Sequence, residues 1–202
     1  TLLPGQSVAL DGRVVTYRFF KTVESELRDL GITLQALTHN LIDDIWTDRP
    51  AALMSPAILL SEAYSGESST SKRSRVAESL KAAGADAAII SQLDSIAWLL
   101  NIRGNDVPHL PVLLSQSILL SDGTQHLFID PAKIPDGFTE HVGKSVFVHD
   151  AADFSGFLER YGAQQPSILL DPDSTNALTA LTCLSSDCRL IEQKDPVEFP
   201  KA

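Results

Sequence analysis

The sequence predicts an α/β fold, in which a mixed β-sheet is covered by helices on both faces and is preceded by a small strand–helix–strand unit. Short apolar runs typical of strands alternate with segments whose apolar residues fit one helical face. One pair of strands is joined by Ser121-Asp122-Gly123-Thr124, which is typical of a hairpin turn. Alternating strands and helices interrupted by one hairpin indicate a mixed sheet with helices on both sides.

The first part of the chain predicts a small strand–helix–strand unit. Strands are expected at residues 7–10 and 32–37, and a helix is expected at 16–30, ended by Gly31. A short helix is expected at 41–46, and Asp48-Arg49-Pro50 opens a linker that runs to about Pro56. This unit is too small to be a domain by itself. A second full set of strand and helix signals follows the Arg49-Pro50 break, so we expect residues 51–202 to form a complete domain of their own.

The second part predicts the sheet. Strands are expected at 58–60, 85–90, 112–120, 125–130, 145–148, 167–170 and 189–191. A loop is expected at 65–71, then a helix capped by Thr70 or Ser71 that runs through Ala83 and ends at Gly84. Further helices are expected at 152–161 and 174–181. We find no internal repeat.

Residues 93–111 hold the most informative segment. Asp94 is expected to cap a short helix whose buried stripe is Leu93, Ile96, Ala97 and Leu100. Gly104 is expected to end this helix, and an irregular loop then carries Arg103, Asn105, Asp106 and His109. Two interpretations of these four residues stay open. Arg103 pairs with Asp106 and pins the loop, or the loop faces the mouth of a neighbouring active site.

Composition and motifs exclude several classes. A net charge of −10 argues against a nucleic-acid partner. The sequence has no run of about 18 apolar residues, the length that spanning a membrane would need. Residues 137–145 resemble a phosphate-binding loop, but they have the wrong spacing and lead into a strand. We find no metal-ligand cluster and no catalytic triad. Cys183 and Cys188 are expected to be free thiols in a reducing cytoplasm, with an incidental disulfide as the alternative.

Three stretches carry a family resemblance. They are LDSIAWLLNIRGNDVPHLPV at 93–112, NLIDDIWTDRP at 40–50 and DPVEFPKA at 195–202. Their residues, order and spacing resemble three-domain Xaa-Pro aminopeptidases (aminopeptidase P), whose first two domains are like the N-terminal domains of creatinase and prolidase. By this resemblance, residues 1–50 are the C-terminal remnant of the first domain and residues 51–202 are the complete middle domain. The sequence also begins without Met, and we expect it to be a fragment that lacks the catalytic pita-bread domain.

The resemblance implies a cytoplasmic metallopeptidase that removes the residue preceding proline and acts on proline-containing peptides. It implies two divalent metals, manganese, held by two Asp, one His and two Glu in a catalytic domain that would follow Ala202. No metal ligand and no catalytic residue are expected in this chain, which is predicted to be inactive alone. Its expected role is to restrict access to the active site, with Arg103, Asn105, Asp106 and His109 in the access loop, and to contribute contacts to a homodimer. The alternative is a stand-alone, non-enzymatic protein-interaction module of the same fold.

Overall fold

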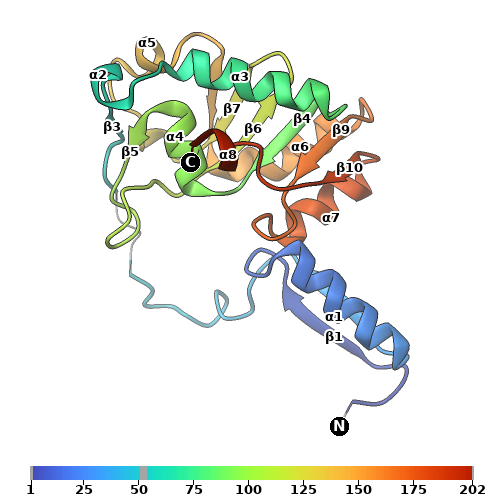
Figure 1. The fold of residues 1–202 in the computed structure, drawn as a ribbon. Helices are drawn as coiled ribbons and strands as arrows, with labels where there is room; N and C mark the ends of the chain where they lie inside the picture. The colour runs from blue at the N-terminus through green and yellow to red at the C-terminus, as the bar shows by residue number, and fades with distance from the viewer. Residues whose placement is uncertain (1, 51–53, 202) are drawn as a thin grey trace.

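The computed structural model describes residues 2–50 and 54–201. Its largest part is a six-stranded sheet with the strand order β10-β9-β4-β6-β7-β8 (Figure 1). The strands are β4 (Ala87–Ile90), β6 (Gln116–Leu120), β7 (Gln125–Phe128), β8 (Val146–His149), β9 (Ser167–Leu170) and β10 (Arg189–Glu192). β10, β9 and β4 are parallel, β6 is antiparallel to both β4 and β7, and β8 is parallel to β7. The predicted mixed sheet is confirmed.

Helices cover both faces of this sheet because neighbouring strand residues point to opposite sides. On one face, α3 (Ser69–Ala82), α4 (Leu93–Leu100) and α5 (Phe138–Val142) pack in the core cluster that contains Ile90. On the other face, α6 (Phe154–Gly162) and α7 (Ala177–Ser185) pack in the cluster that contains Ile89. The predicted cover on both faces is also confirmed.

Short elements complete this part of the chain. They are α2 (Glu62–Ser65), η1 (Pro131–Lys133), η2 (Ala151–Asp153), α8 (Glu198–Lys201) and the antiparallel pair β3 (Ile58–Leu59) and β5 (Ile102–Arg103). Among the described residues, no helix combines the length and the apolar character that crossing a bilayer would need. The two cysteines are free and buried, as expected for thiols, and burial raises the pKa of Cys183 to about 12.

The N-terminal residues form a separate two-stranded parallel sheet of β1 (Ser7–Asp11) and β2 (Thr33–Leu37), and α1 (Tyr17–Asp29) connects the two strands. In Figure 1 this unit lies beside the sheet domain, next to α7. Phe20 and Leu34 pack with Ala177 of α7, so the unit packs against the sheet domain. The expected domain boundary between residues 50 and 51 adjoins residues 51–53, which lie outside the described residues.

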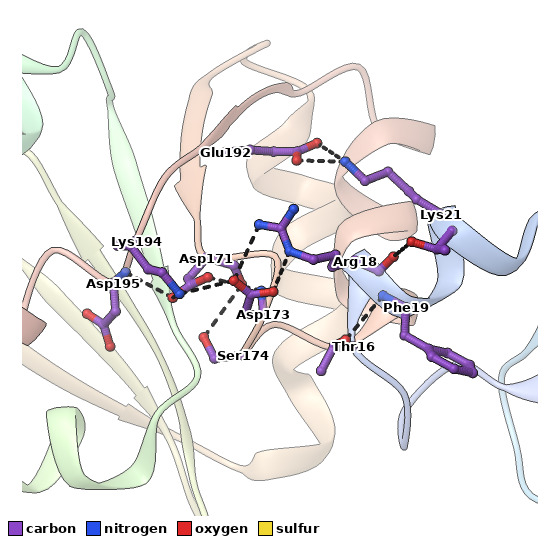
Figure 2. A network of polar contacts seen from close by, with 11 residues as sticks. Thr16, Arg18, Phe19, Lys21, Asp171, Asp173, Ser174, Glu192, Lys194 and Asp195 are labelled. Atoms are coloured by element: carbon purple, nitrogen blue, oxygen red, sulfur yellow. Dashed lines mark hydrogen bonds and ion pairs between the residues drawn. The ribbon is translucent and has the colours of Figure 1, made fainter. Parts of the chain in front are cut away.

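Ion pairs also join the N-terminal unit to the sheet domain (Figure 2). Arg18 of α1 bonds Asp173, and Lys21 bonds Glu192 of β10 at 2.6 Å. Lys194 also bonds Asp173, at 3.0 Å. The helix α1 is thereby linked to the segment that follows β10.

Several expected elements differ in the structure. Residues 41–46 form turns and no helix, because the Asn40 side chain accepts from the Ile42 amide at 2.9 Å and Asp43 pairs with Arg49. Ser68 caps α3, so neither Thr70 nor Ser71 is its cap. The loop expected at 65–71 is shorter, because α2 includes Ser65 and α3 begins at Ser69. The strand expected from 112 begins only at Gln116. The helices α2, α5 and α8 were not predicted.

Candidate functional site

The helix α4 is the base of the candidate site. Ile96, Ala97 and Leu100 of the predicted stripe are buried, but Leu93, its fourth member, is only half-buried. Asp94 does not cap the helix, because the cap position is Gln92 and Asp94 accepts instead from Lys201 Nζ at 2.7 Å. The helix ends at Leu100 and its C-cap is Asn101, which has a φ of 52°, so Gly104 does not end it.

Asn101 holds several segments together at the end of α4. Its side-chain Nδ2 donates to the Glu67 carbonyl at 2.7 Å, and its Oδ1 accepts from Lys72 Nζ at 2.6 Å. The Asn101 carbonyl also accepts from the Leu60 amide, at 2.8 Å. Lys72 is 2% exposed, and burial lowers its pKa. These contacts fix the point from which the loop departs.

Arg103 follows in the short strand β5. Its guanidinium donates to the carbonyls of Ala97 and Ile102, at 3.3 and 2.8 Å. The expected pair between Arg103 and Asp106 is therefore wrong. The side chain turns back over the C-terminal end of α4, where free carbonyls attract a cation.

Asp106 forms a buried ion pair with Lys133 of η1. The two charged groups are 2.6 Å apart, and their side chains are 2% and 7% exposed. The same Asp106 oxygen, Oδ2, accepts from the Leu114 amide at 2.7 Å, while the buried Oδ1 has no partner. Asp106 therefore pins the loop, as the first interpretation supposed, but it does so through Lys133.

The loop backbone is tightly set. Gly104 donates to the Pro111 carbonyl at 3.2 Å, which closes the loop at its base. A Cβ atom on Gly104 would lie 2.3 Å from the Leu113 side chain, so any other residue there would force Leu113 or the loop to shift. His109 has a φ of 64° in the left-handed region. The loop is a rigid projection.

The remaining two predicted residues lie at the tip of this projection. Asn105 and His109 are exposed and line an open pocket of about 280 Å³. The structure therefore divides the four predicted residues into two classes. Arg103 and Asp106 hold the loop, whereas Asn105 and His109 present polar groups at its surface. Such groups can form hydrogen bonds with a ligand, or they can block its approach.

Residues that the sequence analysis missed are the partners of this loop. Lys133 lies 27 positions from Asp106, and no local pattern marks it as a partner. Trp98 lies on α4. It is partly buried against the core, with Lys72 Nζ 4.3 Å and Arg75 Cζ 5.5 Å from its ring centre. Both cations lie over the face of this ring.

The donor side chains of the described residues are scattered rather than grouped. Across residues 2–50 and 54–201, no group of three or more His, Cys, Asp or Glu could hold a metal ion. The described residues therefore do not fit a metal centre of their own, and we assign them no metal-dependent step.

Comparison with known proteins identifies the family. Residues 48–202 match the model of the creatinase/prolidase N-terminal domain. The chain is 32% identical to the Xaa-Pro aminopeptidase ApepP of Drosophila melanogaster over 203 residues, which is 98% of this chain and 32% of that protein. It is 35% identical to a probable Xaa-Pro aminopeptidase P of Tuber melanosporum over 144 residues, which is 70% of this chain and 23% of that protein. The chain thus spans a third or less of the length of these relatives.

Solved structures agree. The X-prolyl aminopeptidase from Caenorhabditis elegans, described as a cytosolic enzyme with a di-nuclear active site, superposes with a TM-score of 0.89 at 26% identity. The match covers 100% of this chain and 33% of that enzyme. An aminopeptidase P structure from Streptococcus thermophilus matches with a TM-score of 0.50 at 10% identity, over 66% of this chain and 98% of that one, and shows the fold alone. The chain belongs to the creatinase/prolidase N-terminal domain family and is similar to the N-terminal region of Xaa-Pro aminopeptidases.

Proposed function

We propose that this chain is the non-catalytic N-terminal and middle region of an Xaa-Pro aminopeptidase. Residues 1–50 are the remnant of a first domain, and residues 51–202 are the middle domain. The single observation that carries the proposal is the match over 98% of the chain to an Xaa-Pro aminopeptidase three times as long. The separate two-stranded sheet of β1 and β2 supports this division of the chain.

The role that we propose for the region is to shape access to the active site. A rigid loop with Asn105 and His109 at an exposed tip suits a wall beside a cleft, because its conformation costs little entropy to fix on binding. Arg103 and Asp106 support the same wall from below. The substrate of the whole enzyme is a proline-containing peptide.

The catalytic metals belong to the remainder of the polypeptide in this proposal. The C. elegans enzyme has a di-nuclear active site, and we expect two divalent ions, manganese, in the catalytic domain that accompanies this chain. We further propose a cytoplasmic location, as for that cytosolic relative, and a homodimer of the whole enzyme to which this region contributes contacts.

The test compares two proteins. The full-length protein, whose reading frame includes residues 1–202, is expected to cleave an Xaa-Pro peptide in the presence of manganese. The 202-residue chain alone is expected to show no turnover above a metal-only blank. Turnover by the isolated chain that survives repurification would refute the non-catalytic role. A full-length protein without peptidase activity would favour the alternative, an interaction module of the same fold.

A further inference from the structure

Phe199 is an exposed aromatic residue on a firmly held segment. It lies on α8 and is 82% exposed. Before it, Asp195 is 4% exposed and Val197 is fully buried. After it, Lys201 Nζ bonds Asp94 Oδ2 at 2.7 Å and Ser95 Oγ at 3.0 Å on α4. Because both flanks are anchored, the exposure of Phe199 is not that of a fraying end.

A groove lies beside this side chain. It encloses about 400 Å³ between α3 and the segment from Gln193 to Pro200. Its apolar lining includes Ala83, Leu169, Pro196 and Phe199, and Arg75 and Lys194 bring charge to it. A preorganised aromatic side chain next to a groove is typical of the anchor of a protein interface.

The length of the relatives, together with the match to an N-terminal domain family, indicates what occupies the groove. The chain covers 32% of the Drosophila enzyme and 33% of the C. elegans enzyme, so two thirds of each relative lies outside the matched region. A polypeptide that continues beyond Ala202 would start within about 10 Å of Phe199, the reach of three extended residues. Such a tether gives an effective concentration on the order of millimolar, so a modest apolar contact suffices for docking.

We propose that Phe199 and this groove are the docking surface for the part of the same polypeptide that follows residue 202. The proposal rests on the proposed function, which makes this chain one region of a longer enzyme. In the full-length protein the Phe199 ring is then buried against residues that follow 202.

The test places the photo-crosslinker p-benzoylphenylalanine at position 199 of the full-length protein. We expect an intramolecular cross-link whose mapped partner lies beyond residue 202. The matched control is the same substitution at Tyr64, which is 83% exposed on α2. A cross-link between two copies, no cross-link, or equal yields at both positions would overturn the proposal.

A second measurement uses alanine. In the 202-residue chain, Phe199→Ala and Tyr64→Ala should both leave the melting temperature unchanged within about 1 °C, because both rings are exposed there. In the full-length protein, only Phe199→Ala should speed proteolysis near the connection, by at least about fivefold, because undocking exposes it. Equal proteolysis rates would contradict docking. If the cross-link forms but no Xaa-Pro peptide is cleaved, the proposed function fails and the docking surface stands.

Discussion

The buried ion pair between Asp106 and Lys133 makes a sharp prediction about the loop. Lys133→Met removes the ammonium that lies 2.6 Å from Asp106 Oδ2. The carboxylate then keeps one backbone donor, the Leu114 amide, in a site where its side chain is 2% exposed and Oδ1 already has no partner. An uncompensated buried charge of this kind costs about 3–5 kcal/mol.

The measurement is urea unfolding of the 202-residue chain at pH 7, supported by thermal melting. The free energy of unfolding should fall by about 3–5 kcal/mol. The melting temperature should fall by roughly 6–20 °C, at about 2–4 °C per kcal/mol for a chain of this size. The double variant Asp106→Leu with Lys133→Met should recover most of this loss, because replacing both charges by apolar groups is often neutral.

The matched control is the exposed pair of Lys81 and Glu78, which are 2.8 Å apart with side chains 53% and 71% exposed. Lys81→Met should cost less than about 1 kcal/mol. If Lys133→Met cost no more than this control, or if the double variant were as unstable as the sum of the two single variants, the reasoning about the buried pair would be refuted.

Two further predictions concern pH and packing. Burial, followed by the charge of His149 at 2.9 Å, lowers the pKa of His126 to about 4 from 6.5. The stability that the neutral form of His126 contributes is complete above pH 6.5 and is lost as the pH falls toward 4. The free energy of unfolding in urea should therefore be lower at pH 5 than at pH 7, and this difference should be smaller in His126→Gln. If this difference were equal in both proteins, the loss of stability at pH 5 would belong to other groups. Gly104→Ala should lower the free energy of unfolding by about 1–3 kcal/mol in the same assay, because its Cβ would overlap Leu113. The control Gly156→Ala in α6 would meet only the flexible end of Arg160, so it should be neutral or stabilising. Gly104→Ala of wild-type stability would show that the loop can shift.

Local patterns predicted those features that depend on local contacts. The buried stripe of α4 and the alternating strand and helix signals were sufficient for the mixed sheet, because burial and periodicity are encoded within each segment. Asp94 shows where such reasoning ends. Its carboxylate looks like a cap in sequence but bonds Lys201, a residue 107 positions away.

The candidate site divides in the same way. The sequence marked the loop through its polar residues and prolines, and the structure places Asn105 and His109 at its exposed tip. It could not indicate that Asp106 would choose Lys133 over Arg103, because that choice depends on how η1 packs beneath the loop. It also suggested a helix at 41–46, where side-chain bonds from Asn40 and Asp43 set turns instead.

We propose that the tip of this loop borders the active site of the full-length enzyme. The most direct measurement is kcat/KM on an Xaa-Pro peptide for wild type and for the double variant Asn105→Ala with His109→Asn, since Asn tolerates the left-handed φ of position 109. We predict a fall of at least about tenfold, which corresponds to about 1.4 kcal/mol of transition-state stabilisation. The melting temperature should stay unchanged, because both side chains are exposed. His39→Ala, with a side chain 56% exposed and far from this loop in sequence, should leave kcat/KM at the wild-type value. A double variant as active as wild type would contradict the claim.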